Sequence, residues 1–244
     1  MAGGGTLLTF PALLYSNVGA MIANATSTLS LLPGAGASLW GYRKEVGKNY
    51  ATLIKLMIPS VIGGVFGAFL LLSTPPEIFK RLVPYLILVA TLLFVIQEPL
   101  SRYLKSKVEK APSDEPELPE EASFTWATWV GAMTFQFFVA IYGGYFGAGA
   151  GILMLAAFGL MGFRNIHRMN GIKNINALCI NVIASIMFIA NRLIRWDCVL
   201  IMSLGAALGG YGGSGIARKI GQKNVRRLII CIGFAMTITL FFKQ

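Results

Sequence analysis

The sequence predicts an all-α, polytopic integral membrane protein built from two homologous halves. Two stretches of forty-two residues, 1–42 and 122–163, contain no charged side chain. Each could hold two membrane spans, because ~20 apolar residues cross a bilayer core. Charged residues make up only 13% of the chain, against roughly 25% in an average soluble domain. Each stretch also carries a glycine cluster, Gly3–Gly5 in the first and 147–151 in the second, and this pairing suggests a duplication.

The apolar stretches predict about 8–9 transmembrane or re-entrant helices. The expected segments are 1–16, 18–40, 51–73, 78–98, 124–145, 147–162, 168–190, 197–217 and 224–242.

An internal repeat relates the halves by a constant offset of 146 residues. The offset places Asn24 on Asn170, and it places the glycines Gly63, Gly64 and Gly67 on Gly209, Gly210 and Gly213. We therefore expect repeat 1 at 1–100 and repeat 2 at 123–244, joined by a linker at 101–122. Segment 124–145 has no counterpart in the first half, so the first helix of repeat 1 is expected to be missing.

The linker begins with four basic residues and continues as an acidic, proline-rich stretch. Its low hydrophobicity, with Pro and Glu, predicts disorder. The excess of Lys and Arg predicts that it lies on the cytoplasmic side of the cell membrane, the inner or plasma membrane.

The orientation of the halves depends on the short segments 1–16 and 147–162. If all nine segments cross, fourteen basic residues fall on one side and five on the other. If both short segments are re-entrant, the division is ten against nine. An odd number of crossings per repeat gives inverted halves, as in many secondary transporters. Both topologies stay open at this point.

The glycine clusters provide the first candidate site residues, Gly3, Gly4, Gly5, Gly149 and Gly151. Glycines in a membrane segment can break a helix, and the next helix N-terminus then directs N–H groups toward an anion. They can equally allow two helices to pack closely.

The helices that follow the glycines provide the others. Polar residues at membrane depth are costly unless they face a cavity or one another. Lys173 is a cation that could attract an anionic substrate, or its side chain could snorkel toward the helix end. Tyr145, like Tyr142, could donate its hydroxyl to a substrate or simply pack. His167 is a lesser candidate, for proton coupling. The candidate set is completed by Asn24, Ser27, Thr28, Asn170 and Asn174.

Other classes of function are disfavoured. The net charge of +11 could indicate nucleic-acid binding in a soluble chain, but the basic residues here lie at the ends of apolar segments. The three cysteines are irregularly spaced, which argues against a metal site, and no cofactor is expected. A single histidine without paired acids offers no nucleophile–base pair, so we expect no enzyme.

The chain resembles the TauE/SafE family of bacterial membrane transporters, often called sulfite exporters. The resemblance rests on the motifs at 3–11, 23–28, 42–44, 144–151 and 170–174. It implies an inner-membrane carrier for small anions, typically sulfur oxyanions or organosulfonates. The leading hypothesis is a secondary transporter that works by alternating access between its two repeats. Its partners would be a small inorganic or organosulfur anion and the lipid bilayer. The alternative is a non-transporting membrane assembly or scaffold protein, and a homo-oligomer is left open.

Overall fold

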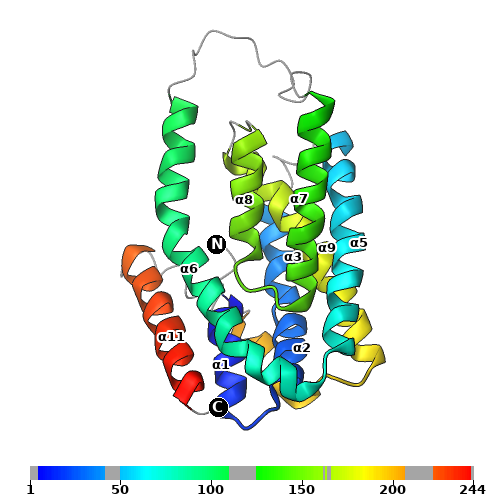
Figure 1. Cartoon of the computed structure of the whole chain (residues 1–244), viewed down its shortest axis with the longest axis vertical. Coiled ribbons are helices and arrows are strands. Elements are labelled where there is room, and N and C mark those ends of the chain that lie inside the picture. The colour runs from blue at the N-terminus through cyan, green and yellow to red at the C-terminus, as the bar shows by residue number, and fades with distance from the viewer. Residues whose placement is uncertain are drawn as a thin grey trace.

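The computed structural model describes residues 5–41, 50–109, 125–161, 163, 166–206 and 222–242. These residues form helices joined by short turns, and no strand occurs among them (Figure 1). The helices are α1 Gly5–Tyr15, α2 Ala20–Ser30, α3 Leu32–Gly41, α5 Tyr50–Ser73, α6 Pro76–Glu109, α7 Trp126–Tyr145, α8 Ala150–Met161, α9 Ile166–Ala190 and α11 Gln222–Phe242, with a further short helix at Trp196–Ala206.

The helices form one bundle in which the two halves of the chain interleave. Helix α5 of the first half packs against α7 and α9 of the second, and α6 packs against α11 (Figure 1). Helix α8 lies between these groups, in contact with α6, α7 and α9. Neither half therefore buries its apolar faces on its own.

Three helical stretches in the described residues are long and apolar enough to cross a membrane: Leu53–Ser73, Pro76–Leu100 and Arg168–Ala190. Large apolar side chains such as Phe66, Phe138 and Leu204 are exposed on the outside of the bundle. In water such a surface would be costly, whereas hydrocarbon accepts it. The all-α polytopic membrane class is confirmed.

Glycines allow α5 and α7 to approach closely. A Cβ atom added to Gly67 would lie 2.1 Å from the carbonyl oxygen of Ile141, and one added to Gly144 would lie 2.5 Å from that of Gly64. Real side chains cannot occupy such positions. Small residues at this interface therefore have a packing role, as they commonly do between membrane helices.

The repeat of the sequence, and the inversion of its halves, stay predictions.

Two predicted segment boundaries were wrong. Segment 18–40 is divided at Leu31 into α2 and α3, because Pro33 has no N–H with which to continue the α2 hydrogen-bond ladder. Segment 78–98 continues to Glu109 in α6, so the start of the predicted disordered linker is helical. No proline or glycine follows Pro99 in this helix, and Arg102 forms an ion pair with Glu98 one turn earlier. The rest of the linker, 110–122, lies outside the described residues.

Candidate anion-binding site

The loop between α7 and α8 is the second glycine cluster of the sequence. Gly147 and Gly149 both have φ of +82°, a backbone conformation that glycine adopts without strain and other residues rarely do. The hydroxyl of Tyr142 donates a 2.6 Å hydrogen bond to the carbonyl oxygen of Ala148. Ala148 is fully buried. The glycines thus reverse the chain inside the protein, and α8 starts there.

Helix α2 of the first half holds this loop from the other side. The amide nitrogen of Asn24 donates to the carbonyl oxygen of Tyr145, at 2.9 Å. Asn24 is almost completely buried, and its Oδ1 atom has no hydrogen-bond partner among the described residues. A buried acceptor without a partner is costly.

Aromatic side chains hold the same loop against α1 and α6. The ring of Phe146 meets that of Phe10 edge to face, with centroids 5.4 Å apart, and Tyr145 meets Phe79 in the same way at 5.7 Å. The Tyr145 hydroxyl lies 3.4 Å from the Thr74 hydroxyl. The Tyr145 ring packs against Phe79, which is one of the two alternatives expected for it. The main-chain carbonyl oxygen of Tyr145 joins the loop to α2.

Lys173 lies on α9 and is only 3% exposed. Its Nζ atom donates to Oδ1 of Asn170 at 3.1 Å, one turn earlier on the same helix. Its aliphatic stem lies on Gly151 in the first turn of α8, where an added Cβ would lie 3.3 Å from the lysine Cδ. The absence of a side chain at Gly151 therefore makes room for the lysine beside the N-terminus of α8.

The corresponding polar residues of the first half are bonded to one another. The hydroxyls of Thr9 on α1 and Ser27 on α2 are 2.6 Å apart, and Thr9 also donates to the carbonyl oxygen of Gly5. The hydroxyl of Thr28 donates to the carbonyl oxygen of Asn24. The Thr9–Ser27 contact joins α1 to α2, whereas the other two bonds each lie within one helix.

The structure brings together some of the predicted site residues but not all of them. Asn24, Tyr145 and Gly149 lie at the loop, and Gly151, Asn170 and Lys173 lie at the adjoining first turn of α8. Ser27 and Thr28 bond within the first half. Asn174 is half-buried on α9. Gly3 and Gly4 lie outside the described residues, as does the side chain of His167. The binding roles of all these residues stay predictions.

A second polar cluster was missed as a site in the sequence. Ser60 on α5, Gln136 on α7 and Asn176 on α9 are each fully buried. Gln136 donates to the Ser60 hydroxyl at 2.8 Å, and that hydroxyl lies 2.9 Å from Oδ1 of Asn176. The sequence did indicate one member of this cluster, because Asn176 follows Lys173 by three residues and so lies on the same face of the helix. The partners on α5 and α7 could not be found from that spacing.

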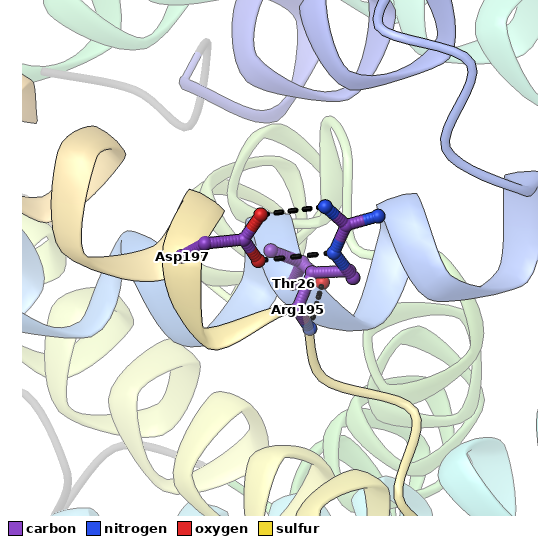
Figure 2. A network of polar contacts seen from close by, with 3 residues as sticks. All are labelled: Thr26, Arg195 and Asp197. Atoms are coloured by element: carbon purple, nitrogen blue, oxygen red, sulfur yellow. Dashed lines mark hydrogen bonds and ion pairs between the residues drawn. The ribbon is translucent and has the colours of Figure 1, made fainter.

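A third polar contact joins α2 to the loop before the helix Trp196–Ala206 (Figure 2). The buried hydroxyl of Thr26 accepts a hydrogen bond from the backbone N–H of Arg195, at 3.1 Å. The Arg195 guanidinium binds both carboxylate oxygens of Asp197, at 3.0 and 2.5 Å. This hydrogen-bonded guanidinium lowers the pKa of the exposed Asp197 carboxyl to about 2, so Asp197 stays ionised near neutral pH and does not titrate there.

Fold and site together define a polytopic, all-helical membrane protein with a buried lysine beside a helix that begins at a glycine-containing loop. The chain belongs to the family described as sulfite exporter TauE/SafE, whose sequence profile matches residues 1–240.

Several curated proteins are similar over nearly the whole chain. A "Probable membrane transporter protein" of Haemophilus influenzae is 28% identical over 246 aligned residues, covering 100% of this chain and 89% of the relative. "Probable membrane transporter protein ORF9" of Sinorhizobium sp is 26% identical, covering 98% and 85%. "Probable membrane transporter protein YfcA" of Escherichia coli strain K12 is 25% identical, covering 99% and 84%. No solved structure matches the chain.

Proposed function

We propose that the protein is a secondary transporter that carries a small anion, such as sulfite or an organosulfonate, across the cell membrane. Transport would occur by alternating access between the two halves of the chain, with the basic linker on the cytoplasmic side. The names of the family and of the three relatives support a membrane transporter. Two features of the site, the buried Lys173 and the N-terminus of α8, support an anion as the substrate.

The observation that carries the proposal is the burial of Lys173 without a counterion. Helix α9 packs against α2, α3, α5, α7 and α8, and none of these six helices contains an Asp or Glu residue. A buried charge is costly unless it is paired. A small anion at this position would supply the missing partner.

The start of α8 adds a second favourable group. The N-terminus of a helix exposes unsatisfied N–H groups and the positive end of the helix dipole. In this bundle the N-terminus of α8 is buried, and the stem of Lys173 lies on Gly151 in its first turn. A sulfite or sulfonate group has oxygens enough to accept from both the lysine and the backbone.

The proposal is tested by anion flux into liposomes that contain the purified protein. We expect uptake of radiolabelled sulfite or of an organosulfonate such as ethanesulfonate. The variant Lys173→Gln should slow uptake by about ten- to a hundredfold, because a hydrogen bond to a charged group contributes roughly 1.5–3 kcal/mol.

Lys55→Gln is the matched control. Lys55 lies on α5 with its Nζ 4.6 Å from the centre of the Trp129 ring, and its side chain is exposed. This variant should transport at the wild-type rate. If Lys173→Gln folds and also transports like the wild type, Lys173 is not part of the anion site. If the wild type moves no anion of this class, the non-transporting scaffold becomes the better hypothesis.

A further inference from the structure

We propose that anion binding at Lys173 is coupled to the uptake of one proton by its amine, so that the anion and a proton move together. The inference rests on the proposed transport function and identifies the ion that accompanies the anion. It follows from the described surroundings of the lysine, which provide a hydrogen-bond acceptor, while the helices packed against α9 carry no Asp or Glu.

Without a bound anion, the site does not stabilise a charged Lys173. With the side chain 3% exposed, water cannot solvate an ammonium at Lys173, and its one hydrogen-bond partner among the described residues is the neutral amide of Asn170. The free energy of burying an unpaired charge in an apolar interior is so high that such groups become neutral instead. A neutral amine can still donate to Asn170. The empty site is therefore stable without the proton.

The helices that pack against α9 offer Lys173 no carboxylate as a counterion. The titratable side chains described on the helices around it are those of Lys55, Tyr142, Tyr145, Arg168 and Cys179; α2, α3 and α8 have none. Lys55 lies over Trp129 and Arg168 lies over the ring of Phe163, at 5.5 Å. The sequences of α5 and α9 add Tyr50 and His167. None of these side chains is a carboxylate.

An entering anion changes the charge state of the Lys173 amine. A monovalent anion beside the amine favours the charged form of the lysine, and the lysine in turn favours the anion. The amine takes one proton from solution as the anion enters, and an ammonium–anion pair forms. On the other side of the membrane the anion and the proton leave together. No net charge crosses the membrane in the loaded form.

This scheme also gives the sign of the pH dependence. Because the proton is bound with the anion, lowering the pH strengthens anion binding and raising the pH weakens it. The apparent affinity changes by up to about tenfold per pH unit in the range where the empty site has lost its proton.

The direct experiment uses the wild-type protein in detergent and weakly buffered solution. The probes are ethanesulfonate and methanesulfonate, because both are monovalent, stay fully ionised near neutral pH and take up no proton themselves. We expect the solution to become more alkaline when either anion binds, by about one proton per bound anion. Binding without proton uptake would overturn the proposal.

The same probes in proteoliposomes separate this proposal from the proposed function. A pH-sensitive dye inside the vesicles should record acidification that accompanies anion entry. If anions enter and the interior pH does not change, the transporter stands and the proton coupling is wrong. If neither anion enters nor binds, the transport function itself fails.

The variant Lys173→Arg tests the role of the amine. Arginine keeps its proton in proteins, so this variant should still bind the anion but take up no proton. Its affinity should be independent of pH, whereas Lys55→Arg should keep the proton uptake and pH dependence of the wild type. Proton uptake that persists in a folded Lys173→Arg variant would assign the coupling to another group and overturn the proposal.

Discussion

The pair α1–α2 and the pair α8–α9 occupy corresponding places in the two halves, but they differ in what they bury. Ser27 and Lys173 are separated by the repeat offset of 146 residues, and each contacts the preceding helix of its pair. In α1–α2 the contact is a hydrogen bond between two hydroxyls, Ser27 and Thr9. In α8–α9 it is a lysine stem against the glycine surface of Gly151.

The two contacts therefore differ in what they leave unpaired. The α1–α2 contact is complete, since both hydroxyls have partners. The α8–α9 contact leaves a buried amine that no carboxylate of the surrounding helices neutralises. The buried lysine thus lies in the second half of the chain. The first half contributes Asn24, which donates a hydrogen bond to the loop before α8.

The largest effect is expected when the lysine is copied into the first half. Ser27→Lys would force a long cation into a position that is fully buried and already filled by the Thr9 contact. An uncompensated buried charge destabilises by roughly 3–5 kcal/mol. We expect a large fall in the melting temperature of the purified protein, or loss of folded protein from the membrane.

Ser16→Lys, at the exposed end of α1, is the control and should behave like the wild type. A Ser27→Lys protein with an unchanged melting temperature would mean that α1–α2 has as much room as α8–α9, and the comparison would no longer hold.

The next effect concerns the loop that starts α8. Gly147→Ala would place a side chain at φ +82°, with its Cβ 3.0 Å from the carbonyl oxygen of Gly143. The left-handed conformation costs non-glycine residues roughly 1–2 kcal/mol. The melting temperature should fall, and anion binding should weaken because the start of α8 is displaced.

The matched control is Gly131→Ala in the middle of α7, where an added Cβ meets nothing within 4 Å. Alanine favours a helix there, so this variant should be at least as stable as the wild type. Equal stability of the two alanine variants would argue against strain at Gly147.

The smallest effect is expected at the contact between α2 and the loop. Asn24→Ala removes the hydrogen bond to the carbonyl oxygen of Tyr145, and such bonds between membrane helices contribute about 0.6 to 1.7 kcal/mol. It also removes the unpaired Oδ1 atom, which offsets part of the loss. We expect a melting temperature slightly below that of the wild type, and slower anion flux because the loop is held less firmly. Flux and stability both equal to the wild type would remove Asn24 from the site.

Much of the helical organisation was predictable because apolar length is a local property. The predicted segment 51–73 became α5 Tyr50–Ser73, and 124–145 became α7 Trp126–Tyr145. The break at Leu31 and the extension of α6 to Glu109 were missed. Hydropathy alone does not register the missing N–H of Pro33, and it scores the charged end of α6 as linker although its residues favour a helix.

The candidate site was predictable only in part. The unusual depth of Lys173 and the spacing of the glycines identified residues that contact one another in the structure. The cluster of Ser60, Gln136 and Asn176 was missed because its members come from three helices that are far apart in the chain. The spacing of residues along one helix says nothing of which face meets another helix.

The sequence alone determined that this chain is an all-helical membrane protein with polar residues at unusual depth, because both properties depend on the order of side chains along single segments. The tertiary structure alone decided that Asn24 binds the loop before α8 and that Lys173 lies on Gly151. It also packed five helices that contain no Asp or Glu against α9, the helix that carries that lysine. These outcomes depend on which helices lie side by side, and that is set by packing between residues distant in the chain.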